Sequence, residues 1–529
     1  MLAIVQIILS IGLLYGVSMG YGAGLARLLG LQVAKSWYGW LGFAVLMFVL
    51  SVTHLFVPIN APVTLVLSVL GLGLFIGLRA WVKLDWRIGA LIGVWILAHT
   101  FQQPTNFDNM LYHLNVVEWF HQYAIVPGLV NLHTRLGFNT GFFLFGAFTN
   151  SLAPYLADRI GHSYLALIGF IWLAEQWQSQ AKHRPFYAVL ILAGLLISAS
   201  RSQPSISNDL PISWLSLPAT VLLLNASQGY TGLRQRDALF ISALIAGAAF
   251  ASKTSAFYHI LSFGTLALLA LWQARQAILR PLLFAAALAV MMASVTLLRT
   301  TISTGYPLYP LSVIRLDADF AIGKDIADLE NRVIRAWGRL QPFDEVNTPE
   351  RILASWDWLV PWYQRYRQWL APVIAFGIGV LWIAGRIYRH RTWLDGLYWI
   401  PAGIALGLWF YSSPDFRFAE GVIWGGIAMG VLFMPRRLAY AIVLVFAIGS
   451  ARHLLLWNPA PPTLLDQSAL VPIEVDGGII FLTKESETCI YSIPCTPYPP
   501  RLAFRIPHNL QAGFRPSPIM TDTTPRSRP

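Results

Sequence analysis

Residues 101–139 form a polar segment between two long apolar parts of the sequence. Only 12% of the 529 residues are charged, so a cluster of ionisable side chains here is more than ordinary surface polarity. Charged groups beside apolar segments of membrane length cost free energy and usually mark a functional site. The ionisable residues of this segment are Asp108, His113, Glu118, His121, His133 and Arg135. We therefore expect the functional site to include it.

Two aspartates are the candidates for acid–base chemistry. Asp108 lies in this segment, and Asp209 lies in a second polar stretch, residues 204–211. A carboxylate at the mouth of a membrane domain can act as a general base, because partial burial raises its pKa. We expect Asp108 to be that base and Asp209 to orient an acceptor or to help bind a cation. Capping of a helix N-terminus is the alternative role for each aspartate.

Cationic side chains at the ends of expected helices suit the binding of a phosphate. Arg201, Lys253 and Arg417 hold these positions, where their alternative role is to reach toward lipid headgroups. Lys253 lies in ASKTS, which lacks the GxxxxGK[ST] pattern of a Walker loop. The other expected substrate-binding residues are His113, Glu118, Arg135 and Tyr306. For His113 and Glu118 the alternative is a solvated position at the membrane interface, and for Tyr306 it is a role in a turn.

The sequence does not require a metal cofactor. The histidines of the polar segment lack a compact ligand spacing such as HExxH, which argues against a zinc site. The residue types allow a hard cation, Mg²⁺ or Mn²⁺, held by Asp108 and Asp209.

Composition and hydropathy predict an all-α polytopic membrane protein. The sequence is 56% hydrophobic, contains 21 tryptophans and has a mean hydropathy of +0.57. Apolar runs near the length that spans a bilayer follow one another too densely for a single soluble core. We expect about fourteen transmembrane helices, all within residues 1–456. Their approximate spans are 2–20, 39–57, 62–80, 87–101, 160–179, 186–201, 211–226, 238–252, 255–273, 281–299, 371–386, 394–412, 419–434 and 437–456.

The basic residues predict the orientation in the membrane. Basic clusters occur in alternate connections of the expected helices, and by the positive-inside rule these connections face the cytoplasm. The clusters are Arg27/Lys35, Arg79/Lys83/Arg87, Lys182/Arg184, Arg234/Arg236, Arg275/Arg280, Arg386/Arg389/Arg391 and Arg436/Arg437. Both termini are then extracytoplasmic, as we expect for a multi-pass protein of the bacterial cytoplasmic (inner) membrane. This placement accounts for much of the net charge of +12 without nucleic-acid binding.

The outer connections are long enough to carry structure of their own. In the outer loop 102–159, residues 109–122 can form an amphipathic helix. The outer loop 300–370 contains a second amphipathic stretch, DADFAIGKDIADLENRVIRAWGRL, which we expect to be a surface helix.

The C-terminal region, residues 457–529, differs from the rest of the chain. The alternation in residues 471–483 predicts one or two strands in this small extracytoplasmic tail. Cys489 and Cys495 are the only cysteines, and an oxidising compartment would allow them to form a disulfide bond. We expect disorder from about residue 515.

An acidic residue in the first large outer loop, followed by amphipathic helices, resembles the GT-C class of membrane glycosyltransferases. The matching residue is Asp108 in FDNMLYH, and the resemblance implies that it is the catalytic base. It also implies a polyprenyl-phosphate-linked sugar donor and an extracytoplasmic glycan, lipid or protein acceptor. Several sequence motifs, spread over most of the chain, are similar to a largely uncharacterised family of bacterial integral membrane proteins. They are YHLNVVEWF, PSISNDLP at 204–211, TGYPLYP at 304–310, SSPDFRFAEG at 412–421 and CIYSIPCTPYP at 489–499.

Two other classes of function remain open at the level of sequence. A transporter or flippase of lipid-linked polysaccharide intermediates would carry polar or broken helices near the middle of the bilayer. The expected spans are nearly free of charge, which favours chemistry at the outer surface. A non-catalytic partner in envelope assembly would need no reactive carboxylate at all.

Overall fold

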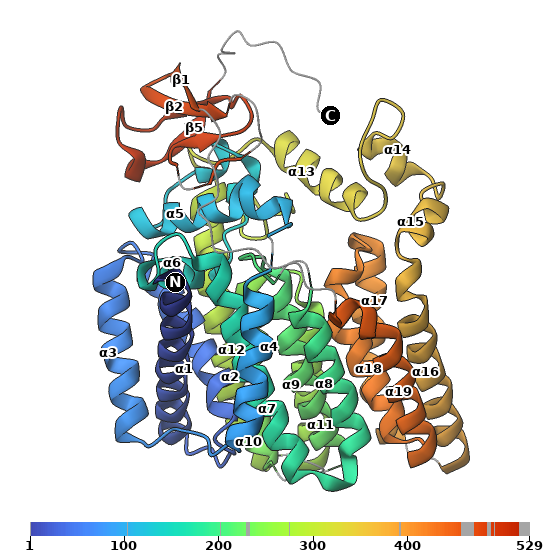
Figure 1. Ribbon diagram of the computed structural model, residues 1–529. Helices are drawn as coiled ribbons and strands as arrows, with labels where there is room; N and C mark the ends of the chain where they lie inside the picture. The colour runs from blue at the N-terminus through green and yellow to red at the C-terminus, as the bar shows by residue number, and fades with distance from the viewer. Residues whose placement is uncertain are drawn as a thin grey trace.

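The computed structural model is all-α apart from a small β region near the C-terminus (Figure 1). It describes residues 2–102, 104–200, 203–228, 233–274, 276–390, 393–455, 470–483, 488–490 and 492–517. Arg201, one of the expected phosphate-binding residues, lies outside this part of the chain.

Long helices run side by side in one bundle, and each of the expected spans coincides with one of them (Figure 1). The bundle helices are α1 (Leu2–Leu28), α2 (Trp37–Thr53), α3 (Ala61–Gly77), α4 (Trp86–Thr100), α7 (Ala157–Ser179), α8 (Arg184–Ser198), α9 (Asp209–Gln228), α10 (Gln235–Ser252), α11 (Phe257–Ala274), α12 (Gln276–Thr304), α16 (Leu370–His390), α17 (Trp399–Ser412), α18 (Glu420–Leu432) and α19 (Arg436–Leu455). Several begin at polar caps, as at α4, where the Asp85 side chain accepts a hydrogen bond from Arg87 N–H at 2.9 Å.

Three of the described helices are long and apolar enough to cross a membrane, judged by length and composition. These segments are Ala3–Leu28, Ala277–Thr304 and Arg367–His390. Other apolar helices, such as Ala61–Gly77 and Glu420–Leu432, are shorter. The helical class is thus confirmed, whereas about fourteen membrane crossings stay a prediction.

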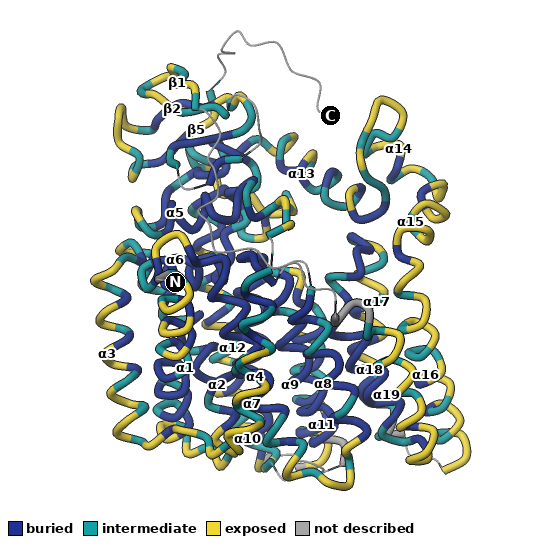
Figure 2. Tube along the Cα trace, in the orientation of Figure 1, coloured by how far each residue is buried: buried dark blue, intermediate teal, exposed yellow. Residues whose placement is uncertain are grey.

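Several connections form a cap at one end of the bundle (Figures 1 and 2), and we call the end that carries the cap the outer end. Its helices are the π-turn η1 (Asn109–His113), α5 (Leu114–Gln122), α6 (Gly141–Leu152), α13 (Lys324–Trp337), α14 (Pro349–Ala354) and α15 (Leu359–Arg365). Short turns complete the chain: η2 (Leu129–Asn131), η3 (Thr134–Gly137), η4 (Ala181–His183), η5 (Arg367–Trp369), η6 (Trp393–Gly396), η7 (Phe416–Phe418) and η8 (Leu510–Ala512).

The polar segment is held firmly on the outer end of the bundle. Ile59 N–H donates to Phe120 O at 2.9 Å, and Ile125 N–H donates to His54 O at 2.9 Å. Arg299 at the outer end of α12 donates to the Asn139 side chain at 2.5 Å. The helix expected at 109–122 is confirmed as η1 and α5, and residues 111–120 are all buried. Its polar face is buried as well because the tail covers this helix.

The tail packs on α5 as two small sheets. Strand β1 (Leu470–Val475) pairs antiparallel with β2 (Gly478–Thr483), with Ile473 opposite Ile480, and β3 (Cys495–Thr496) runs parallel to β2. The second sheet pairs β4 (Leu502–Phe504) with β5 (Phe514–Pro516). The strands expected at 471–483 are therefore confirmed. Disorder from about residue 515 is wrong for 515–517, because β5 pairs with β4, and residues 518–529 lie outside the described part.

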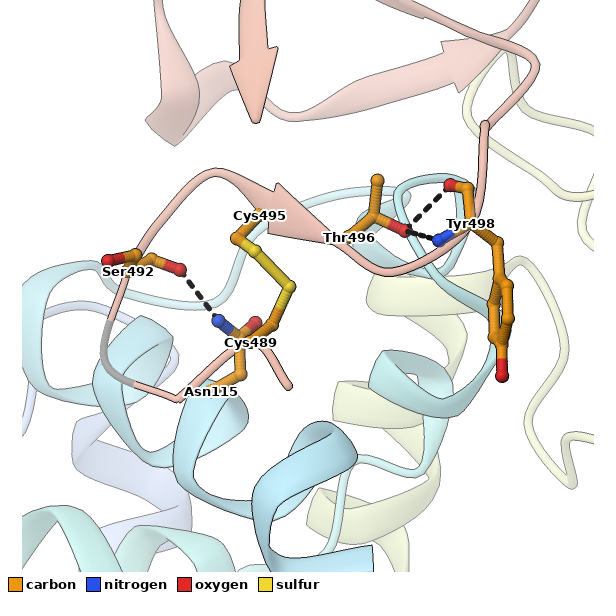
Figure 3. Close-up of a disulfide and its surroundings, with 6 residues drawn as sticks. All are labelled: Asn115, Cys489, Ser492, Cys495, Thr496 and Tyr498. Atoms are coloured by element: carbon orange, nitrogen blue, oxygen red, sulfur yellow. Dashed lines mark hydrogen bonds between the residues drawn. A yellow bond between two sulfur atoms is a disulfide. The ribbon is translucent and has the colours of Figure 1, made fainter. Parts of the chain in front are cut away.

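A disulfide bond joins Cys489 to Cys495, as expected (Figure 3). The loop that it closes contacts α5 directly, because the Asn115 side-chain amide donates to Ser492 O at 2.7 Å. The disulfide therefore shapes a segment that rests on the helix following Asp108.

Two glycines allow the tail backbone to approach the polar segment closely. Gly128 has φ +63° and Gly513 has φ +85°, both in the left-handed region. Phe514 N–H donates to Pro127 O at 3.0 Å, so the backbone of the tail contacts the backbone of the polar segment directly. A Cβ atom on Gly513 would lie 1.9 Å from Pro127 O.

We predict that Gly513→Ala displaces the tail from the polar segment. Gly30→Ala is the matched control: Gly30 has φ +60° but no atom within 4 Å of an added Cβ. The control meets only left-handed strain of about 1–2 kcal/mol, whereas Gly513→Ala adds a backbone clash. The expected result is a larger fall in the thermal unfolding temperature for Gly513→Ala, together with faster proteolysis in 470–517. Equal effects of the two substitutions would show that the close contact is unimportant.

Candidate functional site

Asp108 immediately precedes η1, the π-turn at the start of the polar segment's helix. π-Turns are rare and often occur at functional sites. The Asp108 side chain makes no capping hydrogen bond, so capping is the wrong interpretation for this residue. Its carboxylate instead faces Arg417, with 3.9 Å between Oδ2 and the guanidinium Nη1.

Arg417 lies at the centre of a group of carboxylates from three separate segments. Its Nε is 3.5 Å from Asp209 Oδ2 and 3.3 Å from Asp415 Oδ2. Asp415 also caps η7 by accepting from Arg417 N–H at 3.2 Å, so it both pairs with Arg417 and caps the turn.

Lys253 completes the arrangement from the end of α10. Its Nζ lies 2.5 Å from Asp209 Oδ1 and 3.4 Å from the centre of the Phe418 ring. We call Asp108, Asp209, Lys253, Asp415 and Arg417 the charged cluster. It brings together residues that are more than 300 positions apart in sequence, with three carboxylates against two cations.

The charges of the cluster stabilise one another. Burial acts to raise the pKa of Asp209, but Lys253 and Arg417 outweigh it and hold this pKa below its ordinary value. Burial acts to lower the pKa of Arg417, and Asp209, Asp415 and Asp108 reverse that effect and raise it. Asp209 and Arg417 are therefore ionised at neutral pH. Asp108 is the carboxylate with the longest contact, and 31% of its side chain is exposed.

Backbone contacts fix the spacing between Asp108 and Asp209. The Asn109 side chain accepts from Ile206 N–H at 3.1 Å, which ties η1 to the segment leading into α9. The two ring nitrogens of His162 lie 3.2 Å from Gln203 O and 2.7 Å from Ser207 O. Neither Asn109 nor His162 was predicted from the sequence to belong to the site. His162 had a usable signal, since it is an isolated histidine in a strongly apolar run.

His113 lies beside the charged cluster but is fully enclosed. It is 2% exposed, packs against Phe143 and Tyr112, and its Nδ1 has no hydrogen-bond partner among the described residues. A solvated position is therefore wrong for His113. Burial lowers its pKa to about 4, against the opposing effect of Asp108 and Asp209, so its ring is neutral at pH 7.

Several other expected site residues lie elsewhere. Arg135 pairs with Glu330 of α13 at 2.8 Å, which joins two parts of the cap. Tyr306 is completely buried, and His133 packs against the Tyr498 ring. Glu118 is 8% exposed, which contradicts a solvated position, and accepts from the Gln122 amide at 2.6 Å. His121 and Glu118 line a separate cavity near α6.

An apolar groove of about 260 Å³ lies next to the turn that carries Arg417. Phe416 forms part of its lining, one residue before the guanidinium of the cluster. Two indoles from this region hold the turn: Trp362 Nε1 donates to Pro414 O and Trp409 Nε1 donates to Asp415 O, each at 2.7 Å. The other lining residues are Val373, Phe376, Leu406 and Ile423.

The residues present do not fit a divalent metal. Within the described ranges, no three His, Cys, Asp or Glu side chains are grouped to hold an ion. Asp209 and Asp415 are instead engaged with Arg417 and, for Asp209, with Lys253. We derive no catalytic step through Mg²⁺ or Mn²⁺.

A family model described as a domain of unknown function (DUF8201) matches residues 1–424. All members of the charged cluster lie within the matched residues, whereas the tail lies outside them. No curated protein and no solved structure matches the chain.

We predict that His113 makes the protein sensitive to mild acid. Its folded-state pKa of about 4 lies below the ordinary value of 6.5, so below pH 6.5 the unfolded chain binds a proton that the folded chain does not. Stability should fall between pH 6.5 and 4, by up to about 3 kcal/mol from this residue. Thermal unfolding of wild type, His113→Gln and the partly exposed control His121→Gln across this range tests it. Only His113→Gln should lose less stability than wild type as the pH falls. An unchanged dependence of stability on pH in His113→Gln would contradict the role of His113.

Proposed function

Because the chain belongs to the family described as a domain of unknown function (DUF8201), we propose a function from the site itself. We propose that the protein is a polytopic membrane glycosyltransferase. It transfers a sugar from a polyprenyl-phosphate-linked donor to an extracytoplasmic acceptor, with Asp108 as the base. The observation that carries the proposal is the uncapped Asp108 carboxylate, which lies 3.9 Å from the guanidinium of Arg417, a residue whose turn also borders an apolar groove.

The roles of the two aspartates differ. Asp108 removes the proton from the acceptor hydroxyl, whose oxygen then bonds to the anomeric carbon of the donor sugar. The bond between that carbon and the phosphate oxygen breaks, and polyprenyl phosphate leaves with the electron pair. Asp209 is held ionised by Lys253 and Arg417, which suits it to positioning these cations and not to accepting a proton.

The cations of the cluster suit the leaving phosphate. An arginine has five N–H donors, and 37% of the Arg417 side chain stays exposed beside its three carboxylate partners. Lys253 is 21% exposed. Charge-assisted hydrogen bonds from these groups would stabilise negative charge as the phosphate departs.

The apolar groove gives the donor's lipid chain a place beside the cluster. It lies among α15, α16, α17 and α18, and Phe416 joins it to Arg417 in sequence. The neighbouring helix α16 exposes apolar side chains such as Ile374 (52%) and Leu381 (74%). Such a surface suits lipid contact, so a polyprenyl chain can enter from the bilayer while its phosphate reaches the cations.

The arrangement of the helices supports several membrane crossings. Beyond the three long apolar helices, α3 exposes Leu65 and Val69 by 64% and 60%, as expected for a lipid-facing helix. Basic connections gather at the end away from the cap, where Lys35 Nζ donates to Arg79 O and Arg234 donates to Gly30 O. We propose that this end is cytoplasmic and that the cap, the site and both termini are extracytoplasmic in a bacterial inner membrane.

This orientation predicts which face a membrane-impermeant reagent reaches. The native cysteines are joined in a disulfide, so a single added cysteine reports its own position. Ala34→Cys lies in the α1–α2 connection and Glu345→Cys in the cap, and both positions are exposed. An impermeant maleimide added to intact bacterial spheroplasts should label Glu345→Cys alone, and both variants after lysis. Labelling of Ala34→Cys in intact spheroplasts would refute the orientation.

Substitution of Asp108 tests the enzymatic proposal. Asp108→Asn keeps the shape of the side chain but removes its basicity, so transfer from a panel of labelled polyprenyl-phosphate sugars should fall at least about 100-fold. Asp317→Asn, an exposed aspartate of the cap, should leave the rate unchanged. Arg417→Gln should weaken binding of polyprenyl phosphate about tenfold.

The possible results separate three interpretations. Equal turnover by wild type and Asp108→Asn would remove Asp108 as the base while keeping the transferase. Binding of lipid-linked sugars by wild type without transfer to any acceptor would instead favour a transporter or flippase, or a non-catalytic assembly partner.

A further inference from the structure

A second cavity lies at the opposite end of α5 from the charged cluster. Its volume is about 190 Å³, and it is formed by α5, the end of α6 and the connection from α6 to α7. This volume corresponds to roughly six water molecules, the size of a single sugar ring. The polar residues in its lining are Glu118, His121, Asn150, Ser151 and Tyr155.

Tyr155 adopts a backbone conformation that is unfavourable for its residue type. Its φ is +63°, in the left-handed region that bulky side chains avoid. The Asn150 side chain holds this conformation by accepting from Tyr155 N–H at 2.8 Å. Tyr155 is nevertheless 48% exposed, so burial of its side chain does not compensate for the backbone strain. Strained residues of this kind cluster at sites that bind ligands.

The lining chemistry selects a neutral ligand with several hydroxyl groups. Glu118 offers a mostly buried carboxylate, and Asn150 and Ser151 offer an amide and a hydroxyl group. No Lys or Arg belongs to the lining, and the Glu118 carboxylate would repel a phosphate or another anion. A carboxylate and an amide beside an exposed aromatic ring suit the hydroxyl groups and the apolar face of a sugar.

We propose that this cavity binds one neutral sugar ring and that, given the function proposed above, this ring belongs to the acceptor. Glu118 follows Asp108 by ten helical residues, or about 15 Å along the axis. One sugar ring is too short to occupy the cavity and present a hydroxyl group to Asp108. The acceptor is therefore a chain of several sugars, with one ring in the cavity and a terminal hydroxyl at the base.

Two substitutions test the cavity without disturbing the charged cluster. Tyr155→Gly removes the ring and also relieves the left-handed strain, so the folded state should be as stable as wild type or more stable. Glu118→Gln keeps the side chain's shape but weakens its acceptor character. Saturation-transfer NMR and calorimetric titration of the full chain in detergent would use methyl hexosides, N-acetylhexosamine glycosides and a neutral oligosaccharide as probes. Each variant should lose at least about tenfold in affinity for the probe that binds wild type.

The matched control is Asp317→Asn, an exposed aspartate outside both the cavity and the charged cluster, which should bind the same sugar probe with wild-type affinity. Sugar binding that is lost in Tyr155→Gly and Glu118→Gln supports the cavity even if no lipid-linked donor is ever turned over. The cavity proposal is overturned if the probes do not bind or bind equally to all variants. If such a protein still turns over a donor, the transferase proposal stands. Loss of affinity in Tyr155→Gly together with a lower unfolding temperature would show a structural role for the ring and also overturns the proposal.

Discussion

The rest of the site depends on one requirement, that the charge of Arg417 be matched in a largely apolar protein. Its partners Asp108, Asp209 and Asp415 come from three different connections at the outer end of the bundle. Lys253 adds a fourth connection through Asp209. A charge that is largely removed from water needs partners of opposite charge, so each of these connections helps to hold the others in place. The cluster therefore works as a structural junction between these connections.

The helices could be predicted from the sequence because their cause is local. Runs of apolar residues bounded by caps and basic turns predicted α1 to α4, α7 to α12 and α16 to α19, most of them within a few residues of their ends. The exceptions are α1, α12 and α17, which each have an end five or more residues from the expected one. The hairpin of β1 and β2 followed equally from alternation. The burial of α5 could not be predicted, because it results from a tail that docks across it. Amphipathic periodicity shows that a helix has two faces but does not reveal whether another segment will cover the polar one.

The main residues of the site could be predicted because charged residues are rare in this sequence. Asp108, Asp209, Lys253 and Arg417 were each identified from residue type and position, and the structure brings them together. Arg135 and Tyr306 were not distinguishable by the same reasoning, because pairing with Glu330 and complete burial depend on long-range contacts. Asn109 and His162 hydrogen-bond to backbone atoms, and such contacts cannot be recognised from the residue types of the segment that they hold.

The docking of the tail has a consequence for how the protein is made. The helix beside Asp108 leaves the ribosome long before its cover exists, because Ala124 and Gln511, which hydrogen-bond to each other, are 387 residues apart. Until residues 488–517 have been synthesised, α5 and its neighbours hold apolar side chains such as Trp119 without their final contacts. Such long-range closure is slow and leaves a partly folded chain open to aggregation. Maturation of this region is thus a late event, which follows synthesis of the last bundle helix and of the tail.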